Sequence, residues 1–193
     1  MNLQVTAIPF AAQPAMPWAN GGGSTRQVAI DPPGATLADA FRWRVSIAQI
    51  GSDGPFSRLP GVDRSMWLVS GDGVRLEVDG REVVLAESRQ RLDFPGEPPV
   101  HCELLGGPCE DCNVMTARDR VTAVAEVVEV AAGQGRTLPD APQRLVLLWS
   151  GRGRAAGVPL ASRDAVRIDG RGPAAFAAEA ASVVLVAAFT PRG

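Results

Sequence analysis

The chain has 193 residues, of which 46% are hydrophobic, and a formal net charge of −2. These values fit one or two folded domains and exclude an intrinsically disordered chain. All basic residues are arginines scattered along the sequence, which excludes the clustered basic face typical of nucleic-acid binding. The absence of lysine excludes Schiff-base chemistry and a phosphate-loop lysine.

Neither end of the chain carries a membrane or export signal. The N-terminal stretch MNLQVTAIPFAAQPAMPW lacks the basic start and continuous apolar core of a secretory signal. The most apolar run, Ser182–Phe189, is far shorter than the ~20 residues that span a bilayer. We therefore expect a cytoplasmic protein without membrane contacts. A homodimer is compatible with the sequence.

Short apolar segments with an alternating pattern dominate the chain and predict β-strands. Leu37–Phe41 and Ala174–Ala181 are the two candidates for a turn or two of helix. The predicted strands, in chain order, are Trp43–Ile50, Met66–Ser70, Val74–Val78, Glu82–Leu85, Val100–Leu105, Asn113–Thr116, Val121–Val130, Arg144–Trp149, Ala165–Ile168 and Ser182–Phe189.

A weak internal repeat accompanies this strand pattern. The sequence LVSGDG at Leu68–Gly73 is echoed by LWSGRG at Leu148–Gly153, 80 residues later. This order of elements, a strand followed by a glycine-rich turn and a second strand, is typical of one half of a jelly roll. We predict an all-β bicupin with little helix, in which two jelly-roll-like barrels share strands. Residues 1–118 form the N-terminal barrel, and residues 119–193 form the C-terminal barrel packed on it.

Four sequence blocks resemble the HutD/Ves family of bacterial bicupins. They are PWANGGGST at Pro17–Thr25, WRVSIA at Trp43–Ala48, DGPFSRLPGVDR at Asp53–Arg64 and GGPCEDCNVMT at Gly106–Thr116. In the fourth block Cys112 stands where the family has an apolar residue, and RDR at Arg118–Arg120 replaces a paired arginine. The departure puts the local chemistry around Arg118 in doubt.

The resemblance implies a metal-free, cytoplasmic bacterial bicupin with a regulatory or protective role in histidine utilisation or stress response. It suggests a small anionic metabolite as partner, such as formylglutamate or formiminoglutamate. Arginine is the side chain that binds carboxylates bidentately. Arg64 follows a turn-rich loop and has Asp63 beside it as a pairing partner, so it is either a surface ion pair or a carboxylate ligand at a barrel mouth.

The other candidate ligand residues come from the same blocks. Arg44 and Ser46 share one face of a predicted strand, and that face either meets solvent or lines a cavity. Asn20 precedes three glycines that form either a tight bend or an anion-binding nest. Asn113 offers an amide to a ligand or braces a strand end. The predicted ligand-binding set is Asn20, Arg44, Ser46, Phe56, Ser57, Arg64 and Asn113.

We expect no cofactor and no metal. A single histidine, His101, cannot supply the several histidines of catalytic cupin metal sites. It lies beside Cys102, Cys109 and Cys112, and a zinc site built from these four residues is a weaker alternative.

Binding without catalysis is the favoured hypothesis, and two others stay open. A metal-independent isomerase or hydrolase would need a carboxylate in the same cavity as the arginines, and Glu77, Glu82, Glu103 and Asp111 are available. A protein-interaction scaffold would instead show a filled barrel and an exposed apolar patch.

Overall fold

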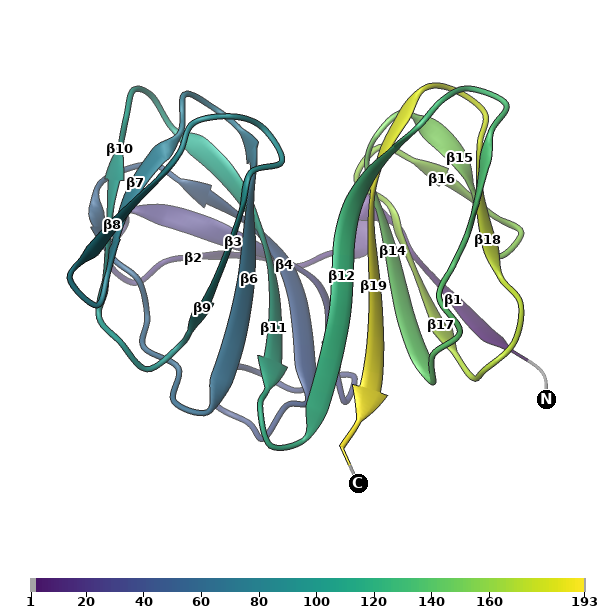
Figure 1. Cartoon of the computed structure of the whole chain (residues 1–193), viewed down its shortest axis with the longest axis horizontal. Coiled ribbons are helices and arrows are strands. Elements are labelled where there is room, and N and C mark those ends of the chain that lie inside the picture. Colours follow the sequence, from purple (N-terminus) through teal and green to yellow (C-terminus); the bar gives the residue numbers. More distant parts are fainter. Residues whose placement is uncertain (1–2, 193) are drawn as a thin grey trace. The chain divides into compact units, whose positions relative to one another are not determined.

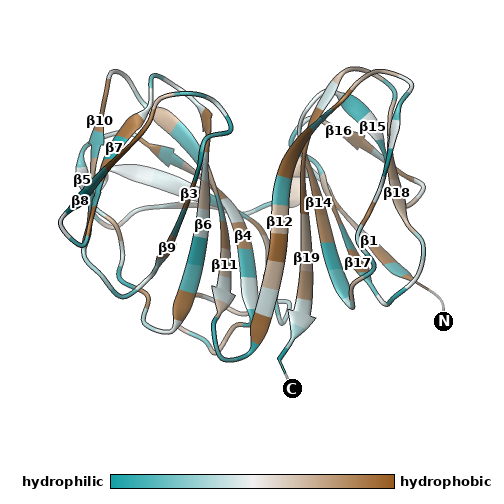
Figure 2. Cartoon of the chain, viewed as in Figure 1, coloured by the Kyte–Doolittle hydropathy of each residue, from teal (hydrophilic) through white to brown (hydrophobic). Residues whose placement is uncertain are grey.

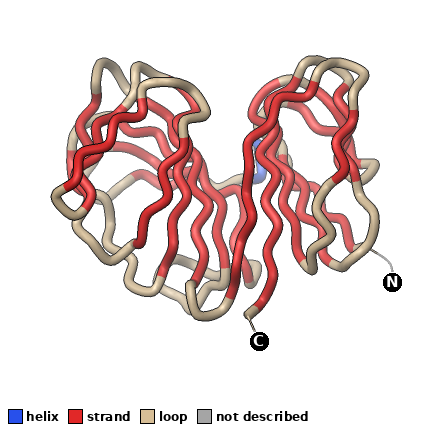
Figure 3. The backbone as a smooth tube through the Cα atoms, in the orientation of Figure 1, coloured by secondary structure: helices blue, strands red, loops and turns tan. Residues whose placement is uncertain are grey.

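The computed structural model describes residues 3–192, and nearly all of their regular structure is strand (Figure 3). The all-β prediction is confirmed. Over these residues the helical content is one 3-10 turn, η1 (Phe10–Ala12). Leu37–Phe41 forms irregular turns, and Ala174–Ala181 contains strand β18 (Ala175–Ala178) instead of a helix. Phe176 and Ala178 alternate into the core, and this burial outweighs the helical preference of alanine. Within the described part of the chain, no helix is both long and apolar enough to cross a membrane.

The chain divides into two compact units, each built from two antiparallel sheets (Figure 1). The N-terminal unit spans Pro14–Arg120. Its larger sheet has the order β2 (Ala15–Pro17), β3 (Gly23–Asp31), β4 (Trp43–Ile50), β11 (Cys109–Ala117), β6 (Val62–Ser70) and β9 (Arg91–Pro95). Its smaller sheet has the order β5 (Gly54–Pro55), β10 (Val100–Leu104), β7 (Val74–Val78) and β8 (Arg81–Leu85).

The C-terminal unit contains the residues from Val121 onward together with those up to Gln13. Its larger sheet has the order β1 (Gln4–Ile8), β17 (Ala165–Asp169), β14 (Gln143–Ser150), β19 (Ser182–Pro191) and β12 (Val121–Val130). Its smaller sheet has the order β13 (Gly135–Thr137), β18, β15 (Arg152–Ala155) and β16 (Val158–Ala161).

Strand β1 corrects the predicted domain boundary. The sequence pattern assigned residues 1–118 to the N-terminal barrel, whereas Gln4–Ile8 pairs along its whole length with β17 of the C-terminal unit. Leu3 and Val5 pack against the apolar core of that unit. The predicted sharing of strands therefore takes the form of one N-terminal strand that completes the sheet of the C-terminal unit.

Each unit has its own core between its two sheets. In the N-terminal unit, Met66, Leu68 and Leu76 belong to an apolar cluster with residues from both sheets. In the C-terminal unit, the corresponding cluster is centred on residues such as Leu148 and Phe176. Figure 2 shows hydrophilic stretches on β4 and β6, while β14 is mainly hydrophobic. Strand β6 of the N-terminal unit thus carries polar side chains, whereas β14, its counterpart in the sequence repeat, is mainly apolar.

The repeat in the sequence corresponds to the same turn in both units. Gly71 follows β6 with φ of 100°, and Gly151 follows β14 with φ of 101°. Both values lie in the region that only glycine adopts without strain. The strand pairing is irregular beside each turn, at Ser70 opposite Glu110 and at Ser150 opposite Val183.

Candidate functional site

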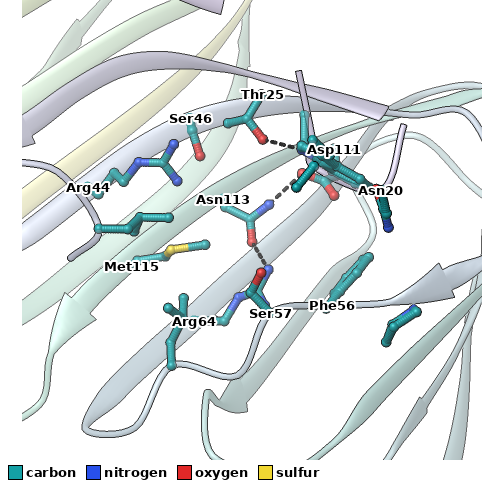
Figure 4. A pocket seen from close by; sticks show the side chains of 16 residues that line it. Asn20, Thr25, Arg44, Ser46, Phe56, Ser57, Arg64, Asp111, Asn113 and Met115 are labelled. Atoms are coloured by element: carbon teal, nitrogen blue, oxygen red, sulfur yellow. Dashed lines mark hydrogen bonds between the residues drawn. The ribbon is translucent and has the colours of Figure 1, made fainter. Parts of the chain in front are cut away.

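The N-terminal unit contains a cavity of about 310 Å³ on the inner face of its larger sheet (Figure 4). Its floor consists of side chains that are almost fully buried, and its mouth consists of more exposed loop residues. The floor residues are Arg44, Ser46, Ala48, Arg64, Asp111, Asn113 and Met115. The exposed mouth residues are Ala19, Asn20, Leu37, Pro55 and Ser57.

Strand pairing explains why these floor residues meet. Side chains on a strand alternate between two faces, and directly paired residues on neighbouring strands share a face. Asn113 on β11 pairs with Ser46 on β4, and Met115 pairs with Arg44 on β4 and with Arg64 on β6. The alternation that left Arg44 and Ser46 either in solvent or in a cavity is therefore resolved in favour of the cavity.

All seven residues of the predicted ligand-binding set line this one cavity. Strands β4, β6 and β11 supply four of them, and the loops around Asn20 and after β5 supply the others. Their roles in binding a ligand remain predictions, since the geometry gives their positions only. The full predicted set is Asn20, Arg44, Ser46, Phe56, Ser57, Arg64 and Asn113.

Arg64 is the most constrained cation of the site. One Nη donates a hydrogen bond to Asn113 Oδ1 at 2.9 Å. The guanidinium lies over two aromatic rings, 5.2 Å from the Phe56 centroid and 4.8 Å from the Phe94 centroid. Its Nε is buried and has no hydrogen-bond partner within the described part of the chain. Buried polar groups are nearly always paired, so this N–H is available to a ligand or a water.

Of the two alternatives for Arg64, the surface ion pair with Asp63 is wrong. Adjacent strand residues point to opposite faces, and Asp63 accepts a hydrogen bond from Arg118 Nε at 2.7 Å. Arg118 also donates to both carboxylate oxygens of Glu97, at 2.9 and 3.0 Å. These bonds lower the pKa of Glu97 to about 2. Arg118 therefore braces the loop before β6 and does not line the cavity.

Asp111 is the site residue that the sequence named only as one of four available carboxylates. Asn113 donates from Nδ2 to Asp111 Oδ1, so Asn113 links Asp111 to Arg64 (Figure 4). The predicted strand began at Asn113, whereas β11 begins at Cys109. Extending the alternation by two residues places Asp111 on the cavity face beside Asn113.

The opening of the cavity is shaped by a tight bend. Asn20 Oδ1 accepts a hydrogen bond from the Gly22 backbone N–H at 3.0 Å, and Gly21 has φ of 73°. Trp18, half-buried at the cavity edge, donates from Nε1 to Thr25 Oγ1 at 2.8 Å. The three glycines thus serve a bend, as one of the two interpretations of this motif expected.

The charges of the cavity do not cancel. Burial lowers the pKa of Arg64 to about 10 although Asp111 opposes the shift, and burial and the proximity of Arg64 lower that of Arg44 to about 10. Both arginines stay cationic at neutral pH. Burial raises the pKa of Asp111 to about 7, against the opposing effects of Arg64 and of hydrogen bonds from Asn113 and the Ala48 backbone. Two cations therefore face one half-ionised carboxyl group.

The shifted pKa of Asp111 predicts a pH-dependent stability. Between pH 3.8, the ordinary pKa of an aspartate, and about 7, the folded protein holds a proton on Asp111 that the unfolded chain releases. Stability therefore falls as pH rises through this interval. Relative to Asp111→Asn, the wild-type free energy of unfolding should drop by about 2–4 kcal/mol between pH 4.5 and 8. Urea unfolding of both proteins tests this, and parallel pH profiles would contradict it.

The residues do not fit the metal centre of a catalytic cupin. The cavity lining contains no histidine and a single carboxylate, which is already bonded to Asn113. His101 is exposed on β10, whereas Cys102, Cys109 and Cys112 are buried free thiols. In residues 3–192, no three side chains of metal-ligating type are grouped so as to hold an ion. The zinc alternative is therefore not supported by the positions of its four residues.

The C-terminal unit shows the same framework with apolar residues at positions that form the cavity floor in the N-terminal unit. Its strand pairing repeats that of β11, so Val184 and Val186 on β19 take the places of Asp111 and Asn113. Both valines belong to the apolar core cluster. Arg144, the counterpart of Arg64, instead donates to the carbonyls of Gly170 and Gly172, each at 2.8 Å. Its role is to tie loops together.

Comparison with known proteins identifies the family to which the chain belongs. The HutD family model matches residues 11–186. An uncharacterised 21.2 kDa protein in the hutC 3' region of Pseudomonas putida is 43% identical over 110 residues, 57% of each chain. Protein Ves of Cronobacter sakazakii is 38% identical over 120 residues, 62% of this chain and 64% of that protein. The matched stretches thus span less than two thirds of these two curated relatives.

Solved structures agree over nearly the whole chain. HutD from Pseudomonas fluorescens SBW25 superimposes with a TM-score of 0.84 at 29% identity, covering 98% of this chain and 100% of that one. Oxalate decarboxylase from Lactobacillus farciminis, a cupin, reaches a TM-score of 0.70 at 11% identity, covering 97% and 86%, which shows the fold alone. Since the family model and the fold agree with the blocks found in the sequence, the chain belongs to the HutD family of bicupins.

Proposed function

We propose that this protein is a cytoplasmic, metal-free binding protein whose N-terminal barrel holds a small carboxylate metabolite. The single observation that carries the proposal is the pair of buried arginines, Arg44 and Arg64, facing a cavity with only one carboxylate opposite them. Burying unpaired charge is costly, and an anionic ligand would balance it. Arginine is also the side chain best suited to bind a carboxylate through two parallel hydrogen bonds.

The site offers what recognition of such a ligand needs. The unpartnered Nε of Arg64 and the Ser46 hydroxyl can donate to a carboxylate, and Asn113 fixes the guanidinium plane. Phe56 covers the other side of the guanidinium. The names of the relatives point to histidine utilisation, which makes formylglutamate and formiminoglutamate the first candidates. In that role the protein would regulate or protect the pathway by sequestering an intermediate.

A thermal-shift screen tests the proposal. Histidine, urocanate, formylglutamate and formiminoglutamate are added at millimolar concentration, and at least one carboxylate is expected to raise the melting temperature in a saturable way. A ligand at 100 times its Kd stabilises the folded protein by about 2.7 kcal/mol. Sodium chloride at matched ionic strength is the control for a general salt effect. No saturable shift with any of the four would contradict carboxylate binding.

Metal-independent catalysis is the second candidate, because Asp111 supplies the carboxyl group that it requires. A pKa of about 7 suits a group that both accepts and donates a proton at neutral pH. Product analysis by NMR after prolonged incubation with each bound ligand distinguishes the two functions. Unchanged ligand favours binding, whereas turnover lost in Asp111→Asn establishes catalysis.

A further inference from the structure

We infer that Asp111 is a specificity residue, which selects carboxylate ligands that also carry an N–H donor, such as N-acyl or N-imino amino acids. This inference rests on the proposed function and names the ligand class of the same cavity. It follows from the placement of the buried carboxyl group on the cavity floor, where Asn113 lies between it and the Arg64 guanidinium.

The spacing comes from the strand register. Arg44 and Arg64 both pair with Met115, whereas Asp111 lies four residues earlier on β11, opposite Ala48. At about 3.4 Å per residue, these two levels of the sheet are about 13 Å apart at the backbone. The long side chain of Arg64 reaches back to Asn113, which lies between them (Figure 4). A ligand that spans a guanidinium and Asp111 therefore needs two functional groups.

The chemistry of Asp111 defines the second group. As an ionised carboxylate it only accepts hydrogen bonds, and it has about four acceptor positions. Asn113 and the Ala48 backbone use part of this capacity. A ligand N–H pointing at Asp111 is stabilised, whereas a ligand oxygen or second carboxylate there meets the same charge. A carboxyl group that served the fold alone would not need to be on the cavity wall.

The local charges predict how selection depends on pH. Arg64 on β6 attracts the Asp111 charge, Glu110 on β11 repels it, and the Cys102 thiol on β10 lies within its influence, with Arg44 on β4 also facing the cavity. Neutral Asp111 can donate a proton to a ligand oxygen, so protonation favours ligands without an N–H. The preference for ligands with an N–H over ligands without one should thus be largest above pH 7 and smallest at acidic pH.

Matched pairs of small acids test the inference by calorimetry or thermal shift. N-acetylglycine is compared with 4-oxopentanoate, and N-acetyl-β-alanine with 5-oxohexanoate, so that within each pair CH₂ replaces N–H in a chain of the same length. In at least one pair we expect the amide to bind about tenfold or more tightly at pH 8.5, as a hydrogen bond to a charged group provides. The preference should shrink to threefold or less at pH 5.5.

The variants separate selection from general anion binding. In Asp111→Asn the preference should be small and independent of pH, while both acids of a pair still bind. Glu110→Gln, which removes the neighbouring carboxylate outside the cavity lining, should keep the preference for the amide at pH 8.5. Equal binding within both pairs, or failure of both amides to bind, overturns the inference. Binding of the oxo acids without the amides would also overturn the inference, but the proposed binding of carboxylates would stand.

Discussion

An Arg64→Met variant is expected to lose about 2–4 kcal/mol of carboxylate-binding free energy, which is about a 30- to 700-fold rise in Kd. The loss is large because Arg64 is 7% exposed and its Nε has no hydrogen-bond partner among residues 3–192, so a bound anion would be shielded from water. Methionine keeps an unbranched apolar side chain but removes the charge, which lies over the Phe56 and Phe94 rings, and every donor.

Isothermal titration with the strongest ligand of the screen measures this effect. Arg75→Met is the matched control, because Arg75 is an exposed arginine on β7 paired with Glu103 at 3.0 Å and does not line the cavity. The control should bind like the wild type. Equal affinity of Arg64→Met and the wild type would remove Arg64 from the site. Retained folding is verified by circular dichroism.

Alanine at Gly151 is expected to destabilise the protein by about 2–4 kcal/mol, a large effect for one added methyl group. Gly151 has φ of 101°, which is strained for any side chain. A Cβ there would also overlap the Ala181 carbonyl oxygen and lie 2.8 Å from the Ser182 Cα. The backbone of β19 would have to move away from the turn.

Gly71→Ala should behave in the same way, since its φ is 100° and its Cβ would lie 2.8 Å from the Cys109 Cα. Gly107→Ala is the control: nothing lies within 4 Å of its Cβ position, and its φ lies outside the glycine-favoured region. Urea unfolding followed by tryptophan fluorescence compares the three. A loss as small in Gly71→Ala and Gly151→Ala as in Gly107→Ala would mean that the repeated turn does not constrain the fold.

Most floor residues of the cavity could be predicted from the sequence because they lie on strands, where side chains alternate between two faces. Alternation on β4 put Arg44 and Ser46 on the face away from Trp43, and this face is the cavity floor. Asp111 was not singled out because the CEDC run at Cys109–Cys112 carries no clear alternation of apolar and polar residues. Its importance comes from its burial and from the link that Asn113 makes to Arg64 on β6, and neither follows from the local sequence.

The sequence by itself determined the fold class and the family, and it pointed to seven of the residues that line the cavity, because strand alternation, turn residues and family blocks are local features of the chain. Only the tertiary structure decided which polar and charged side chains interact with one another. It joined Asp111 to Arg64 through Asn113, moved Asp63 to Arg118, and placed Gln4–Ile8 in the C-terminal unit. The Arg64–Asn113 and Asp63–Arg118 bonds and the pairing of β1 with β17 join segments far apart in the sequence. The Asp111–Asn113 bond lies within β11, but the burial of both residues is set only when the sheets pair.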